Sequence, residues 1–206
     1  MEESPQLPTA VLFHDSLCKN INNTILRKEG VITTKVWAPT LEEIQEKAED
    51  MEHADVIVIE SLTREISKDC DPEEVVHAVT RTVNKCLSKS EKVVISSIIN
   101  REDDDTLGVK AEIVNANLKY RYLNNTNVLI CNNDNLYNRK YRTEDKLHLS
   151  DHGTSLFATN LKYKISEALG ITVEKKRKPG NNQNRYRNNR RYTQHFDDNG
   201  FEGGNW

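Results

Sequence analysis

The sequence lacks the features that mark membrane and secreted proteins. No apolar run approaches the ~20 residues that a helix needs to cross a bilayer. The first residues, Met1-Glu2-Glu3-Ser4-Pro5, are acidic and polar, whereas a secretory signal has a basic and then an apolar segment. The four cysteines are scattered and form no C-x-x-C pair, which disfavours a disulfide framework. We therefore expect an intracellular protein, cytoplasmic or nuclear, with reduced thiols and no membrane contact.

Glycine is also scarce, with eight residues in 206. The segment His14-Asp15-Ser16-Leu17-Cys18-Lys19, which follows the first apolar run, contains none. A phosphate-binding loop at this point of an α/β domain depends on glycine, so the sequence disfavours a flavodoxin-like nucleotide binder. His148 and His152 are four residues apart, but further metal ligands at fixed spacing do not accompany them. The sequence therefore predicts neither a cofactor nor a metal.

Charge is divided unevenly along the chain. Residues 1–173 carry 28 Asp and Glu against 21 Lys and Arg, whereas eight Lys and Arg fall between Lys175 and Arg191. This Asn-, Arg- and Tyr-rich tail cannot bury a core, and we expect it to be disordered. Arginine neutralises phosphates and tyrosine stacks on bases, which favours binding of RNA or single-stranded DNA over a plain linker. A nuclear localisation role for Lys175–Lys178 is equally compatible with these residues. The candidate contacts are Lys175, Lys176, Arg177, Lys178, Arg185, Tyr186, Arg187, Arg190, Arg191 and Tyr192.

The remaining chain has the pattern of one α/β domain. We predict a flexible N-terminus at 1–7, a domain at 8–172 and the basic tail at 173–206. Short β-branched runs alternate with amphipathic stretches, and two runs are continuously apolar, as in parallel strands covered on both faces. The expected strands are Ala10–Phe13, Val31–Val36 (near an edge), Asp55–Glu60, Lys92–Ile98 and Asn127–Cys131. The expected helices are Ser16–Lys28, Thr40–Met51, one opening at Asp71-Pro72, Leu107–Tyr120 and Gly153–Leu169.

Two short segments carry the side chains of a serine hydrolase. The first strand delivers Asp15 and Ser16 to the start of a helix, and Asp145 and His148 lie three residues apart ahead of the last helix. A hydroxyl nucleophile, an imidazole that accepts its proton and a carboxylate that orients the imidazole form the catalytic unit of such enzymes. Ser16 also fits a simpler role as a residue that caps a helix.

This order of elements resembles the SGNH/GDSL hydrolase family over roughly Val11 to Leu169. It is similar in particular to the esterase-like domains of some retrotransposon-encoded proteins, in which an equivalent of Asp145–Gly153 closes the domain. The resemblance implies a three-layer α/β/α fold with about five parallel strands in flavodoxin-like order. It also implies hydrolysis of a small acyl ester through an acyl-enzyme, with Ser16 as nucleophile, His148 as general base and Asp145 as its orienting partner.

The chain departs from this family where the oxyanion hole is formed. The first block reads His14-Asp15-Ser16 in place of Gly-Asp-Ser, Ala38 stands in place of the second block's glycine, and Arg64 in place of the third block's asparagine. The resemblance implies Ser16, Ala38 and Arg64 as the positions of the oxyanion donors. Elsewhere, the loss of one such donor lowers the rate by about 10²–10³-fold.

Two functions therefore remain open. The first is a weak or specialised ester hydrolase with a tail that binds nucleic acid. The second is a catalytically degenerate SGNH-fold module of a retrotransposon-like protein, which binds RNA or single-stranded DNA through the same tail. The complete triad favours the first function, and Arg64 favours the second.

Overall fold

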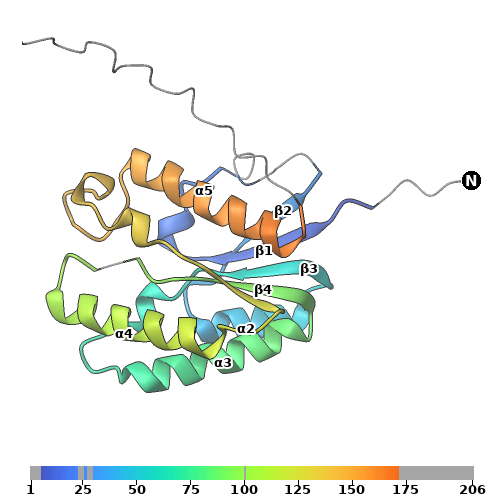
Figure 1. Cartoon of the computed structure of the whole chain (residues 1–206), viewed down its shortest axis with the longest axis horizontal. Coiled ribbons are helices and arrows are strands. Elements are labelled where there is room, and N and C mark those ends of the chain that lie inside the picture. Colours follow the sequence, from blue (N-terminus) through green and yellow to red (C-terminus); the bar gives the residue numbers. More distant parts are fainter. Residues whose placement is uncertain (1–5, 23–25, 27–29, 100, 172–206) are drawn as a thin grey trace, which may run out of the picture. The chain divides into compact units, whose positions relative to one another are not determined.

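The five apolar runs form a single parallel sheet. The computed structural model describes residues 6–22, 26, 30–99 and 101–171. The strands lie in the order β2-β1-β3-β4-β5, and each neighbouring pair is parallel (Figure 1). Their bounds are β1 Thr9–His14, β2 Ile32–Trp37, β3 Ala54–Ile59, β4 Ser90–Ser96 and β5 Val128–Cys131. The flavodoxin-like order and the edge position of the second strand are both as predicted.

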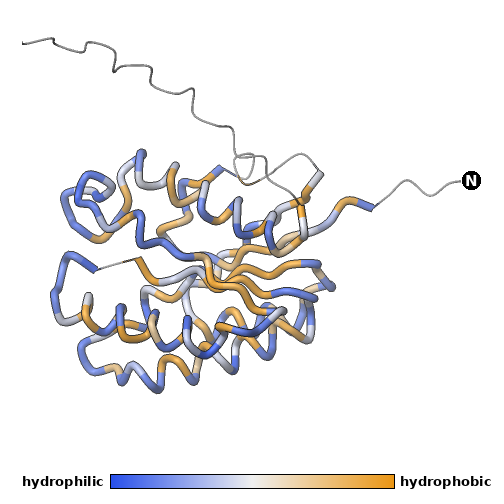
Figure 2. The backbone as a smooth tube through the Cα atoms, viewed as in Figure 1, coloured by the Kyte–Doolittle hydropathy of each residue, from blue (hydrophilic) through white to orange (hydrophobic). Residues whose placement is uncertain are grey.

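Helices cover both faces of this sheet, which gives three layers. Helices α2, α3 and α4 lie on one face and α5 on the other (Figure 1). Their bounds are α2 Leu41–Asp50, α3 Pro72–Leu87, α4 Asp105–Arg121 and α5 Asp151–Ala168. Successive side chains of a strand point to opposite faces, so Ile57 packs in the cluster under α2–α4 and Val58 in the cluster under α5. The apolar strands accordingly run through the middle of the domain, between more polar helices (Figure 2).

The predicted helix starts are also found where the capping residues stand. The hydroxyl of Thr40 accepts a hydrogen bond from the backbone N–H of Glu43 (3.2 Å), as in a capping box. The Asp71 carboxylate accepts from the N–H of Glu73 (2.9 Å), and Pro72 occupies the first turn. These local signals set the helix boundaries on the α2–α4 face.

The prediction of a helix at Ser16–Lys28 is wrong over its first part. Between Ser16 and Asn22 the structure forms only the short 3₁₀ helix η1, Ser16–Cys18. Leu26 is helical, and residues 23–25 and 27–29 lie outside the described chain. The ammonium group of Lys35, which comes from β2, donates to the carbonyls of Cys18 (2.7 Å) and Ile21 (2.8 Å). In a continuous α-helix these carbonyls would accept from amides one turn further along. The carbonyl of Cys18 also accepts from the N–H of Ile21 (3.0 Å), an i→i+3 bond, so Lys35 binds a turn of the 3₁₀ type and not an α-helix.

Two parts of the predicted organisation fall outside the described residues. One is residues 1–5 of the N-terminal segment. The other is residues 172–206, which include the whole predicted tail 173–206 and all ten candidate nucleic-acid contacts between Lys175 and Tyr192. Both stay predictions. Within the described ranges, none of the helices is both long enough and apolar enough to cross a membrane.

Candidate functional site

A pocket of about 540 Å³ lies where the ends of β1 and β3 meet the segment before α5. β1 is flanked by β2 on one side and β3 on the other, so the strand order reverses at this point, and parallel sheets bind ligands there. The pocket brings together Ser16, which follows β1, and His148, which precedes α5. The lining residues are Asp15, Ser16, Leu17, Thr63, Arg64, Ile66, Arg101, Leu147 and His148.

The predicted acid and base form a direct pair. Nδ1 of His148 donates to Oδ2 of Asp145 at 2.7 Å. The other oxygen of Asp145 accepts from the Thr143 hydroxyl (2.6 Å) and from the N–H groups of Leu147 and His148 (2.9 Å each). The hydrogen bonds from Thr143 and His148 hold the pKa of this carboxyl well below its usual range. Because Nδ1 is engaged, Nε2 is the nitrogen of His148 left to exchange a proton in the pocket.

The turn that carries this pair is fixed at its base. Arg142 and Leu149 form an antiparallel bridge, and the N–H of Thr143 donates to the carbonyl of His148 (3.0 Å). Gly153, in the first turn of α5, leaves space for the carbonyl of Tyr141, which accepts from the N–H of Ser150 (2.9 Å). A Cβ at Gly153 would come within 2.2 Å of that oxygen. The end of the Asp145–Gly153 segment thus requires glycine for packing.

Ser16 is exposed at the first position of η1. Its side chain forms no hydrogen bond with any described residue, so the contact between its Oγ and His148 is not made in this structure, although both line one pocket. Unliganded active sites commonly show long nucleophile–base distances that shorten when substrate binds. The Asp15 carboxylate caps η1 by accepting from the N–H of Leu17 (2.8 Å), so the capping role falls to Asp15 and not to Ser16.

Two buried carboxyl groups support the turn that carries Ser16. Glu60, at the end of β3, is 4% exposed and accepts from the N–H of Asp15 (3.1 Å), which is itself 2% exposed. Burial raises the pKa of Glu60 to about 8, and the nearby charge of Asp15 adds to the shift. Burial also raises the pKa of Asp15, against the Leu17 hydrogen bond and the charge of Arg64. Sequence reasoning missed Glu60, although an acid that ends a continuously apolar strand was a signal.

The three predicted oxyanion positions have different surroundings in the structure. The N–H of Ala38 donates to the carbonyl of His14 (3.1 Å), and Ala38 is completely buried outside the pocket. This bond extends the β1–β2 ladder and engages the N–H of Ala38, which argues against the oxyanion donor predicted there. Arg64 does line the pocket, from the 3₁₀ helix η2, Thr63–Glu65. The N–H of Ser16 forms no hydrogen bond with the described residues and stays a candidate donor.

The remaining histidines near the pocket have structural contacts. His14 is buried, packs edge-on against Trp37 (ring centroids 5.6 Å apart) and donates from Nδ1 to the carbonyl of Asp15 (2.9 Å). His152 stacks on Tyr141, with ring centroids 5.2 Å apart. Among the described residues, no cluster of three or more His, Cys, Asp or Glu is arranged to hold a metal ion.

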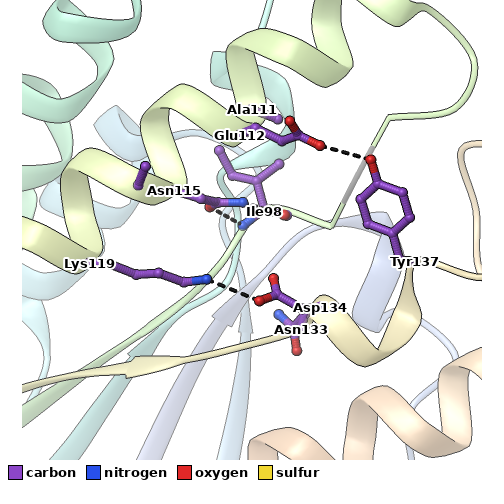
Figure 3. Close-up of a pocket in the computed structure, with 9 residues that line it drawn as sticks. Ile98, Ala111, Glu112, Asn115, Lys119, Asn133, Asp134 and Tyr137 are labelled. Carbon is purple, nitrogen blue, oxygen red and sulfur yellow. Dashed lines mark hydrogen bonds and ion pairs between the residues drawn. The ribbon is translucent and has the colours of Figure 1, made fainter.

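A second cavity, of about 350 Å³, opens between α4 and the segment after β5 (Figure 3). Its polar groups are engaged with one another: Tyr137 donates to Glu112 (2.8 Å) and Lys119 pairs with Asp134 (3.2 Å). The side-chain oxygen of Asn115 accepts from the N–H of Ile98 (2.9 Å), and its amide nitrogen donates to the carbonyl of Ile98 (2.8 Å). With its charges already paired, this cavity offers no comparable chemistry.

Comparison with known proteins bears on the fold. No family model and no curated protein matches the sequence. Among solved structures, a member of the lipolytic G-D-S-L family from Veillonella parvula is similar with a TM-score of 0.61 at 15% identity, covering 80% of this chain and 99% of that one. A GDSL-like lipase from Bacteroides thetaiotaomicron gives 0.63 at 14% identity, covering 78% and 88%. A carbohydrate acetylesterase from Sinorhizobium meliloti gives 0.57 at 12%, covering 79% and 98%.

These similarities show that the chain has the three-layer α/β/α fold of SGNH/GDSL hydrolases, as the sequence predicted. At 12–15% identity they establish the fold alone. Unrelated chemistries share common folds, so the activity has to be argued from the side chains of the pocket.

Proposed function

We propose that this protein is an SGNH-type serine ester hydrolase that cleaves small acyl esters. The observation that carries the proposal is the arrival of Ser16 and the His148–Asp145 pair at one pocket, from segments about 130 residues apart in sequence. A capping residue alone would need no ordered imidazole opposite it. The relation to the esterase-like domains of retrotransposon-encoded proteins is part of the same proposal and rests on the Asp145–Gly153 segment.

The proposed reaction has two halves, acylation of Ser16 and hydrolysis of the acyl-enzyme, and His148 transfers the proton in both. Oγ of Ser16 attacks the acyl carbon while its proton passes to Nε2 of His148. The C–O bond to the alcohol then breaks, and the alcohol leaves with that proton. Water attacks the acyl-enzyme in the same way, giving its proton to His148, and the acid departs as Ser16 regains a proton. The N–H of Ser16 and the guanidinium of Arg64 are the proposed donors to the oxyanion.

Labelling with a fluorophosphonate probe tests this proposal. We expect the full chain to form a covalent adduct at Ser16, located by mass spectrometry of the peptide, because only an activated serine reacts with such probes. Hydrolysis of a short-chain nitrophenyl ester would be followed in parallel. Ser16→Ala, compared at matched circular dichroism, should show neither adduct nor turnover.

The alternative, a degenerate SGNH-fold module, gives a different result in the same experiment. The loss of the amide at Ala38 to the β1–β2 ladder supports this alternative, because it removes one of three expected donors. An adduct without turnover would indicate an activated serine with a defective oxyanion hole. A folded protein that forms no adduct would contradict the hydrolase proposal and leave the binding module.

We further propose that the chain after Val173 binds RNA or single-stranded DNA. Its eight Lys and Arg and its interspersed tyrosines support the proposal. Deletion after Val173 should abolish binding of a single-stranded oligonucleotide, and the intact chain should lose at least about tenfold in affinity between about 50 and 200 mM salt. A full-length variant with Arg185, Arg187, Arg190 and Arg191 changed to Gln is the matched control for length. Equal affinity in the deletion would refute this assignment.

A further inference from the structure

Two arginines line the pocket that contains Ser16 and His148. Arg64 belongs to η2, which follows β3, and Arg101 belongs to the segment between β4 and α4. The hydrolysis of a neutral ester develops one negative charge, on a single oxygen. Neutral donors such as backbone N–H groups and an asparagine amide are enough to stabilise that oxygen in other enzymes, so a full positive charge at the pocket points to a further feature of the substrate.

The two arginines are held in different ways. Arg101 donates from Nε and Nη2 to both carboxylate oxygens of Asp103 (2.8 and 2.6 Å), and its side chain is 13% exposed. This bidentate pair fixes the guanidinium plane and balances its charge. Arg64 is exposed and forms neither a hydrogen bond nor an ion pair with any described residue.

The acidic groups near Arg64 do not neutralise it by contact. The carboxylate of its neighbour Glu65 accepts the N–H of Leu41 at the start of α2 (3.0 Å). Asp15 lines the same pocket, but it is buried beneath the turn and caps η1. Asp145 is committed to His148 and Thr143. Arg64 therefore presents an uncommitted positive charge to whatever occupies the pocket.

We infer that the pocket takes an ester whose acyl or alcohol part carries an anionic oxygen group, a carboxylate or a phosphate, and that Arg64 binds this group. The inference rests on the proposed esterase function and names its substrate class. A guanidinium presents a planar fork of donors that matches both kinds of anion. The asparagine expected at this position is neutral and could not form an ion pair with either.

Paired substrates that differ by one anionic group test the inference. In the acyl arm, 4-nitrophenyl hydrogen adipate is compared with 4-nitrophenyl hexanoate, which has a methyl group in place of the carboxylate. In the alcohol arm, 1-butyryl-glycerol 3-phosphate is compared with 1-butyryl-glycerol. We expect kcat/KM to favour the anionic member of at least one pair by about tenfold, and the preference to shrink in high salt.

The Arg64→Gln variant separates the two roles open to this residue. If Arg64 served only as an oxyanion donor, its loss would lower kcat/KM by the same factor for both substrates of a pair. The ratio of the two kcat/KM values would then stay unchanged. Recognition of the anionic group predicts instead that the ratio falls toward one. Arg81→Gln, an exposed position on α3 with the same change in net charge, should keep the wild-type ratio. No preference in an active wild type, or a preference kept in Arg64→Gln, would overturn the inference.

A binding measurement distinguishes failure of this inference from failure of the proposed function. Calorimetric titration of the full chain with adipate and with inorganic phosphate requires no turnover. If wild type forms no fluorophosphonate adduct but binds either anion, and Arg64→Gln does not, the hydrolase proposal fails and the anion site stands. Equal binding, or none, in both proteins would remove the anion site.

Discussion

Replacing His148 by alanine is expected to lower kcat/KM for a short-chain ester by about 10³-fold or more. His148 is the only imidazole among the residues that line the pocket with Ser16, and its Nδ1 is fixed by Asp145 at 2.7 Å. Removal of one member of such a triad elsewhere abolishes most of the catalysis that the unit provides. Stopped assays with 4-nitrophenyl acetate and the rate of fluorophosphonate labelling both measure the loss.

Chemical rescue distinguishes a catalytic base from a structural residue at this position. The His148 side chain is 44% exposed, so added imidazole can reach the space that the alanine variant leaves. We expect imidazole to restore part of the labelling rate in His148→Ala and to have no effect on Ser16→Ala. His77→Ala, on the exposed surface of α3, is the matched control and should behave as wild type. Unchanged activity in His148→Ala would disprove its role as base.

Replacement of Asp145, the partner of His148, tests the same catalytic pair. Asn at position 145 keeps an oxygen that can accept the N–H groups of Leu147 and His148, so the turn should survive Asp145→Asn. Its amide would present a donor to Nδ1 and thus favour the wrong tautomer, which elsewhere lowers kcat by about 10⁴-fold. Since Asp145 is half exposed here, we expect kcat for a short-chain nitrophenyl ester to fall by less, about 10²-fold.

The fold was predictable because its signals are local. Continuous β-branched runs fixed the strands, and Thr40 and Asp71 marked helix starts that the structure confirms. The prediction of a helix fails between Ser16 and Asn22, where a non-local contact forms: Lys35 reaches from β2 to the carbonyls of Cys18 and Ile21. No helical periodicity within that segment could reveal a cation that arrives from another strand.

In the site too, local contacts could be predicted from the sequence and non-local contacts could not. Asp145 and His148 are three residues apart, so their contact follows from one short turn and could be read from the sequence. Whether the amide of Ala38 faces the pocket depends on the register between β1 and β2, in which His14 lies opposite Trp37. That register is a property of the assembled sheet. The same holds for Glu60, which touches Asp15 only because β1 and β3 are neighbours.

We expect Glu60 to contribute to the pH dependence of stability. The groups that face its carboxyl are Asp15, whose N–H it accepts, the Cys18 thiol, which donates to it, and Lys35. Its pKa rises from 4.5 in an unfolded chain to about 8 in the fold, chiefly through burial. Between these values the native state binds more protons than the unfolded state. The free energy of unfolding therefore falls as pH rises through this window, by up to about 1.4 kcal/mol per pH unit.

The Glu60→Gln variant should remove this slope, because the amide stays neutral at every pH and its oxygen can still accept the N–H of Asp15. Relative to wild type, we expect the variant to gain about 2 kcal/mol between about pH 6 and pH 8.5, with no further gain above that. Urea denaturation at several pH values measures the difference, and Glu52→Gln, an exposed acid just before β3, is the control. Since Glu60 supports the turn that carries Ser16, its ionisation should also slow fluorophosphonate labelling in wild type above about pH 8, and less so in the variant. Parallel stability profiles would mean that Glu60 is already ionised in the native protein at neutral pH, and the buried-acid account of this turn would then be wrong.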